Sequence, residues 1–250
     1  MAGHSKWANI KHRKGAQDAK KSKIFNRMSK EIMVAARDGG EDPEANPALR
    51  TAIQNAKGVN LPKDRIEKAI KKGVGDEGEN LMSLTYEGYG PGGIAFFVEA
   101  TTDNQNRAVS NIRSIFTKYG GSLGKNGSVE HLFDKKGVFT IEKGQISSFD
   151  KEELEMDLID SGAEDVVDEE EIYVIYTDFQ DFGMMQKKLD ELKIEPKNSE
   201  LQRIPKATTK VDTDTGKRVL KMIDAFENSD EVNNVFHNLE LTEELYKMLL

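Results

Sequence analysis

The hydrophobic pattern of this chain changes its period near Leu81, and the change limits the folds that the chain can adopt. Between residues 17 and 73, apolar side chains recur every three or four positions, which is the spacing of amphipathic helices. From residue 81 onward, apolar runs of strand length alternate with glycine-containing turns. We therefore expect a helical N-terminal part, followed by a part in which helices pack against sheets.

The helical part should form a small bundle that ends near residue 78. Ser5 and Gly15 are placed to begin and to end a first short helix, and a second helix should end at Gly39. The second helix has one apolar face, made of Phe25, Met28, Ile32 and Ala36. Two further short helices follow, each with a proline at its start and a glycine at its end.

The rest of the chain is expected to form two mixed domains. Residues 81–133 predict two strands around a Gly-Pro turn, a helix and a further strand. Residues 137–204 predict the order β-α-β-β-α-β, which is typical of ferredoxin-like domains. The fold class is therefore α+β and multidomain: a basic helical domain (1–78), a middle α/β domain (79–135 plus 205–250) and an inserted ferredoxin-like domain (136–204).

Composition excludes several classes of protein. The chain has 250 residues and no cysteine, which excludes a disulfide framework, zinc knuckles and thiol chemistry. It lacks an apolar run of about 18 residues and an apolar signal-peptide core. We expect a cytoplasmic protein without a membrane partner, while a transit-peptide reading of the basic N-terminus stays open.

Charge is distributed unevenly along the chain. Residues 1–74 contain 17 Lys and Arg against 8 Asp and Glu, whereas the remaining residues contain 19 against 36. The N-terminal part is thus strongly basic, although the whole chain has a formal net charge of −8. Such a split predicts a polyanion-binding head on an acidic body.

The basic residues gather around two features of the N-terminal part. One group flanks Trp7, whose ring could stack on an unpaired base or pack with Ile10 inside the bundle. The other group lies on the second helix, opposite its apolar face, and includes Arg37. The predicted nucleic-acid-binding residues are Lys6, Trp7, Lys11, Arg13, Lys14, Lys20, Lys23, Arg27 and Lys30. Phosphate contacts of this kind carry no sequence code.

Other motifs have ordinary explanations. Gly88, Gly90 and Gly93 match G-x-G-x-x-G, but a strand follows instead of a helix, so we expect a hairpin turn. The acidic run 168–171 is expected to be a solvated connection, with a cation site as the weaker reading. No histidine pair has metal-ligand spacing, and we expect neither a cofactor nor a metal ion.

A possible secondary polar site lies in "EATTDNQNR" and consists of Asp103, Asn104 and Arg107. These residues would crowd the N-terminus of the next helix, where anions bind. Capping of that helix by Thr102 or Asp103 would explain the motif equally well. No nucleophile with a base and an orienting group can be assembled from spacing, so an enzyme built around this site is the weaker class.

Several stretches of the sequence resemble the YebC family: "MAGHSKWANIKHRKG", "RDGGEDPEANPALRTAI", "NLPKDRIEKAIKKG", "YEGYGPGG", "TTDNQNR" and "GSVEHLFDKKG". The resemblance spans essentially the whole chain. It implies an N-terminal helical bundle and two α/β domains, of which one is inserted into the other. It also implies either a DNA-binding transcriptional regulator or a translation factor that helps ribosomes through proline-rich stretches.

Together these observations predict a non-enzymatic, nucleic-acid-binding regulator of gene expression. The partner would be DNA or ribosomal RNA, and the alternative function is that of a ribosome-associated, RNA-binding translation factor. A protein-interaction adaptor, whose basic helices dock an acidic protein, is a third reading. The sequence leaves the oligomeric state open.

Overall fold

The computed structural model describes residues 18–75 and 80–249, with side chains described from residue 21 onward. These residues form two compact units, each built from two separate segments of the chain. The first unit combines residues 18–75 with residues 135–202. The second unit combines residues 80–134 with residues 203–249. The division into three domains stays a prediction.

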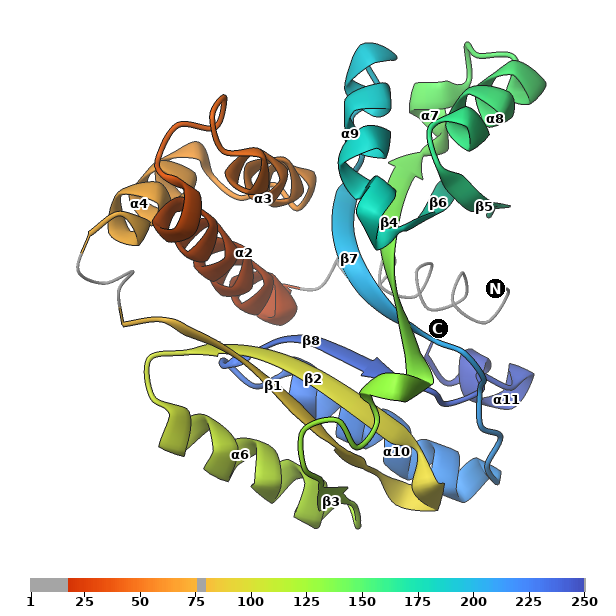
Figure 1. Ribbon diagram of the computed structural model, residues 1–250. Coiled ribbons are helices and arrows are strands. Elements are labelled where there is room, and N and C mark those ends of the chain that lie inside the picture. Colours follow the sequence, from red (N-terminus) through yellow and green to blue (C-terminus); the bar gives the residue numbers. More distant parts are fainter. Residues whose placement is uncertain (1–17, 76–79, 250) are drawn as a thin grey trace. The chain divides into compact units, whose positions relative to one another are not determined.

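From residue 18 onward, the described part of the first unit begins with three helices: α2 (Asp18–Gly39), α3 (Pro47–Gly58) and α4 (Lys63–Gly73) (Figure 1). Asn46 joins the first two, because its side chain accepts a hydrogen bond from the Leu49 N–H and donates one to the Ala35 carbonyl. The core between the helices consists of Met28, Ile32, Ala36, Leu49, Ala52, Ala56, Leu61, Ile66 and Ala69. Three of the four predicted apolar residues of α2 are in this core, and the fourth, Phe25, is half-buried beside it.

The second segment of the first unit is a four-stranded sheet with the strand order β5-β6-β4-β7. Its strands are β4 (Phe133–Glu142), β5 (Ala163–Asp168), β6 (Ile172–Asp178) and β7 (Asn198–Pro205). Its helices are α7 (Lys143–Ile146), α8 (Lys151–Asp160), the 3-10 helix Phe179–Asp181 and α9 (Phe182–Glu191). The predicted succession of strands and helices is found, with α7 as an addition that the sequence pattern did not indicate.

Helix α3 packs against the edge of this sheet. Asn55 and Ser199 of β7 exchange two hydrogen bonds, and both residues are buried. Thr51 and Gln54, on the same helix, each lie within hydrogen-bond distance of Gln186 in α9. The helical segment and the β5-β6-β4-β7 sheet are therefore held together by hydrogen bonds of polar side chains.

The second unit is built on a sheet with the order β3-β1-β2-β8 (Figure 1). Its elements are β1 (Met82–Tyr89), the 3-10 helix Pro91–Gly93, β2 (Ala95–Thr102), α6 (Gln105–Lys118), β3 (Ser122–Leu123), the 3-10 helix Glu130–Leu132, α10 (Thr213–Glu227), β8 (Val232–His237) and α11 (Glu243–Lys247). Strand β8 pairs antiparallel with β2, so the C-terminal segment completes the sheet that β1 begins.

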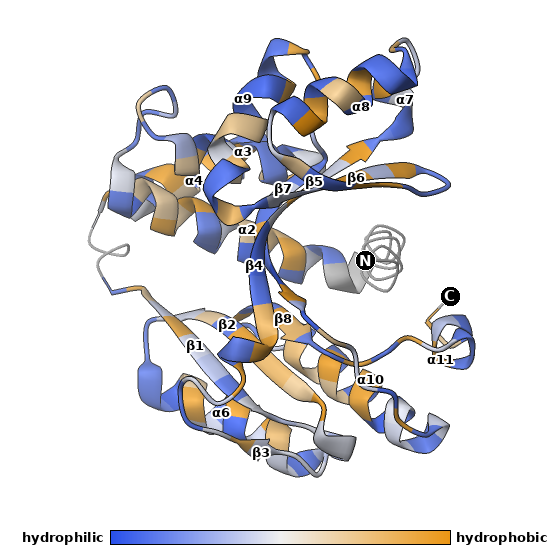
Figure 2. Cartoon of the chain, turned by 45° about the vertical axis from the view of Figure 1, so that its right-hand side comes forward, coloured by the Kyte–Doolittle hydropathy of each residue, from blue (hydrophilic) through white to orange (hydrophobic). Residues whose placement is uncertain are grey.

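Helices α6 and α10 cover one face of this sheet. The Phe116 ring of α6 lies 5.1 Å from the Phe226 ring of α10, and Phe96 of β2 contacts both rings. Apolar residues of α10 gather on the side that lies against the sheet (Figure 2). Burial of such side chains contributes about 1.5–3 kcal/mol each, which fixes the two helices on the sheet.

One expectation about this unit needs correction. The glycine-rich motif is the predicted hairpin turn, but the segment before β4 is a loop and a 3-10 helix instead of an extended strand, with His131 exposed. His237, in contrast, lies in β8 with an exposed fraction of 9% and its ring 6.0 Å from Phe96. The loop differs from a strand because the buried Glu87 carboxylate accepts three of its backbone N–H groups.

Candidate nucleic-acid interface

Most of the predicted nucleic-acid-binding residues precede the described part of the chain. Lys6, Trp7, Lys11, Arg13 and Lys14 lie outside the described residues. Lys20 belongs to the first turn of α2, but its side chain is not among those described. The role of these six residues stays a prediction.

The three remaining predicted residues lie on one face of α2. Lys23, Arg27 and Lys30 follow each other at intervals of four and three positions, and all three are half-buried. The Arg27 side chain is 30% exposed, and its Nε lies 3.4 Å from Glu31 Oε1. The sequence predicted these cations on the side of the helix opposite its apolar face, and the structure shows that their side chains are half-buried there.

An aromatic ring with two nearby cations lies on the opposite, apolar side of α2, and the sequence pattern did not indicate this arrangement. The Lys21 ammonium lies 5.8 Å from the centroid of the Phe25 ring, and the Arg65 guanidinium carbon of α4 lies 5.7 Å from the same centroid. Arg65 also donates a hydrogen bond to Asn26 Oδ1 at 3.3 Å. Cations over a ring attract its electrons, so Phe25 holds both side chains at the surface of α2 and α4.

Helix α4 adds further positive charge to the same unit. Its outward side carries Lys63, Lys68, Lys71 and Lys72, all of them exposed. Lys63 and Lys68 lie 3.9 Å from Glu67 and Asp64, distances at which exposed pairs contribute little. The sequence "KDRIEKAIKKG" already indicated these cations, because its apolar residues share one side of the helix and its lysines lie on the other side. Such side chains are the usual contacts for phosphate groups.

The possible secondary polar site is a hydrogen-bonded cluster at the start of α6. Asn104, and not Thr102 or Asp103, caps the helix, because its side chain accepts the Arg107 N–H at 3.0 Å. The Arg107 guanidinium binds Glu231 through Nε at 2.7 Å and Asp103 through Nη2 at 2.6 Å. These bonds raise the pKa of Arg107.

Glu231 is the buried centre of that cluster. Burial by itself would raise the pKa of the Glu231 carboxyl, but hydrogen bonds from Arg107, Asn111 and Thr102 outweigh burial and hold the pKa below its usual value. The cluster ties α6 to the start of β8, which is a structural task. Binding of a ligand by Asp103, Asn104 and Arg107 stays a prediction.

Neither a membrane-spanning helix nor a metal site is found among the described residues. Within residues 18–75 and 80–249, no helix is both long and apolar enough to cross a membrane. The same residues contain no group of three or more His, Asp or Glu side chains placed to hold a metal ion. The acidic run 168–171 forms part of the β5–β6 hairpin, where Asp168 pairs with Lys143 and Lys151.

Comparison with known proteins places this architecture in one family. Residues 5–76 match the TACO1/YebC protein N-terminal domain, and residues 81–239 match the TACO1/YebC second and third domain. The crystal structure of the conserved hypothetical protein Aq1575 from Aquifex aeolicus superposes with a TM-score of 0.82 at 42% identity, over 91% of this chain and 93% of that one.

Curated relatives are similar over nearly their whole length. A probable transcriptional regulatory protein of Amoebophilus asiaticus (strain 5a2) is 49% identical over 241 residues, which are 96% of this chain and 98% of the relative. One from Geobacter sp. (strain M21) is 48% identical over 245 residues, 98% of each chain. The chain belongs to the TACO1/YebC family, and its relatives support a regulator at the level of the family.

Proposed function

We propose that this protein is a cytoplasmic, non-enzymatic regulator of gene expression that binds nucleic acid through its basic N-terminal helices. Three of the proposed contact residues lie on the described part of α2: Lys23, Arg27 and Lys30. The other proposed contact residues are Lys6, Trp7, Lys11, Arg13, Lys14 and Lys20. The domains 79–135 plus 205–250 and 136–204 serve as its acidic body, next to a binding domain of residues 1–78.

The observation that supports this proposal most strongly is the opposite charge of the two parts of the chain. Residues 1–74 hold 17 of the 36 basic side chains and only 8 of the 44 acidic ones. The described helices place part of this charge around the half-buried Phe25 ring, with Lys21 and Arg65 on either side. A surface rich in lysine and arginine side chains suits a polyanion such as a nucleic acid.

The names of the relatives support a regulatory role, and DNA is the partner that their names favour. The lysine and arginine side chains of the described helices suit contacts with phosphate groups, and these helices show no arrangement for reading bases. Binding should therefore be largely independent of sequence and strongly dependent on salt.

The first test is a salt titration of the whole chain with labelled duplex DNA and with labelled single-stranded RNA. If six phosphates are neutralised, a plot of log affinity against log salt concentration should have a slope of about −4 to −5. A slope near zero would contradict the proposal, because it would leave no phosphate contacts.

A second experiment identifies the physiological partner. Cell lysate is sedimented with and without ribonuclease, and the position of the protein is followed. Co-migration with ribosomes that ribonuclease abolishes would assign RNA and the translation alternative. Recovery with promoter DNA would assign transcription. An acidic protein that stays bound after nuclease treatment would favour the adaptor reading instead.

A further inference from the structure

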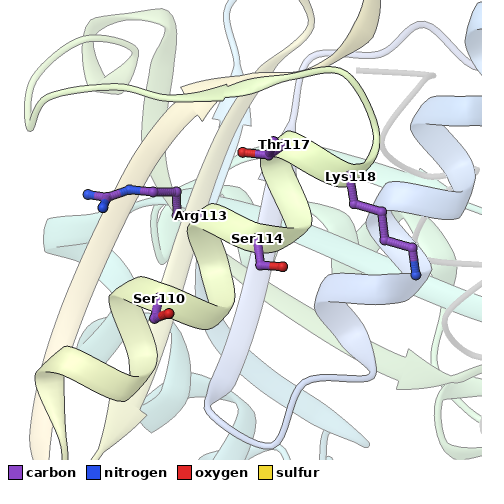
Figure 3. Close-up of a pocket in the computed structure, with 5 residues that line it drawn as sticks. All are labelled: Ser110, Arg113, Ser114, Thr117 and Lys118. Atoms are coloured by element: carbon purple, nitrogen blue, oxygen red, sulfur yellow. The ribbon is translucent and has the colours of Figure 1, made fainter.

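The outward face of α6 in the second unit combines hydroxyl groups with unneutralised cations. Ser110, Ser114 and Thr117 succeed each other at intervals of four and three positions, so they form one stripe along the helix. Arg113 and Lys118 flank the stripe on opposite sides (Figure 3). These five exposed residues line an open pocket of about 520 Å³.

The charge on this face is not compensated by neighbouring acids. Helix α6 contains three basic residues and neither Asp nor Glu. Arg107 is neutralised by Asp103 and Glu231, but the Arg113 side chain has no hydrogen bond or ion pair with any residue in the described part of the chain. The Lys118 ammonium lies 5.6 Å from the neighbouring Tyr119 ring.

The neighbouring helix also exposes basic side chains. Helix α10 packs beside α6 on the same side of the sheet (Figure 1). The Lys118 side chain points toward α10 (Figure 3). Helix α10 exposes Arg218 and Lys221, whereas its exposed Lys217 lies 3.4 Å from Asp214.

We propose that this face, made of Ser110, Arg113, Ser114, Thr117 and Lys118, is a second contact for the phosphodiester backbone of a nucleic acid. Arginine, lysine, serine and threonine side chains bind phosphate oxygens. The stripe contains no Asn or Gln side chain, whose amide could bind a base edge through two hydrogen bonds. The stripe from Ser110 to Thr117 rises about 10 Å, which covers about three phosphates of one duplex strand.

This proposal rests on nucleic-acid binding as the proposed function and goes beyond it. It places a phosphate contact on the second unit, although the chain after residue 74 contains more acidic than basic side chains. The basic N-terminal helices and α6 would then both contribute phosphate contacts. Each contact would raise the affinity and steepen the dependence on salt.

The test compares three double variants of the whole chain for binding of labelled single-stranded RNA and labelled duplex DNA. Arg113→Gln with Lys118→Gln removes the cations of α6 and keeps residues that favour helix. Lys23→Gln with Lys30→Gln weakens the N-terminal surface. Lys187→Gln with Lys193→Gln is the control, because it removes two exposed charges from another part of the chain.

We expect the α6 variant to lose about tenfold or more in affinity at moderate salt and to reduce the salt slope by about 1.5. The control should change neither quantity beyond the small effect of net charge. Circular dichroism and the melting temperature of each variant show whether it is folded, and Ser114→Ala in a folded chain provides a milder second variant.

Each outcome decides the matter. Loss of binding with the N-terminal variant alone would overturn the α6 contact and leave the proposed function intact. Unchanged binding with both variants would overturn both. An α6 variant that keeps its nucleic-acid affinity but loses a nuclease-resistant protein partner would assign this face to a protein and overturn the inference.

Discussion

Asn55 of α3 and Ser199 of β7 exchange two hydrogen bonds although 144 residues separate them in the sequence. The Asn55 amide donates to the Ser199 carbonyl oxygen at 2.7 Å, and the Ser199 N–H donates to Asn55 Oδ1 at 2.8 Å. β7 is an edge strand of its sheet. The side-chain amide therefore satisfies backbone groups that a neighbouring strand would otherwise bind, and it fixes the helical segment to the sheet.

The first prediction concerns this pair. Asn55→Ala should lower the free energy of unfolding by about 2–4 kcal/mol, because it leaves a buried N–H and a buried C=O without their partner. Urea denaturation measures the change. Gln54→Ala is the matched control, since Gln54 is only half-buried, and it should cost less than about 1 kcal/mol. Equal losses in the two variants would contradict the assigned role.

The second prediction concerns the close approach of α3 to β7. A Cβ atom at Gly58 would overlap the backbone carbonyl oxygen of Lys197. Gly58→Ala should therefore destabilise the protein by about 1–3 kcal/mol, even though alanine favours helix. Gly183→Ala in α9 is the control, because its Cβ would meet no atom within 4 Å. A Gly58→Ala variant as stable as the control would show that helix and strand are not in contact in solution.

The third prediction concerns acid stability. Burial by itself would raise the pKa of the Glu87 carboxyl, but the N–H groups of Gly127, Val129 and Glu130, with the positive charge of Arg203, outweigh burial and lower that pKa. Because the pKa is lower in the folded state, the carboxylate stabilises the protein above its unfolded pKa of about 4.3. This stabilisation is lost as pH falls through the folded value.

The measurement is the free energy of unfolding between pH 7 and pH 3 for the wild type and for Glu87→Gln. The variant should be less stable near neutral pH, and its stability should fall less steeply on acidification. Parallel pH profiles for the two proteins would mean that Glu87 titrates alike in the folded and unfolded states.

Local signals in the sequence were sufficient to predict most of the elements. Helix α2 ends at Gly39, as predicted, and the hairpin of β1 and β2 turns at the predicted glycines. The cap of α6 was assigned to the wrong residue, because Thr102, Asp103 and Asn104 are all good capping residues and only the observed backbone selects Asn104.

Contacts between distant segments could not be predicted. Asn55 looks like a neutral position within a helix until β7 is placed beside it. The approach of Arg65 to Phe25 likewise depends on how α4 packs against α2. In the predicted site, spacing correctly placed Lys23, Arg27 and Lys30 on one face of α2, but it did not reveal that they are half-buried.

The central claim is that cations of the N-terminal helices hold a nucleic acid, and charge reversal tests it most directly. The whole chain carrying Lys20→Glu, Lys23→Glu, Arg27→Glu and Lys30→Glu is compared with wild type for retention of labelled DNA and RNA at low ionic strength, with circular dichroism to verify folding. We expect a folded variant that retains neither. A folded variant that holds both as tightly as wild type would contradict the claim.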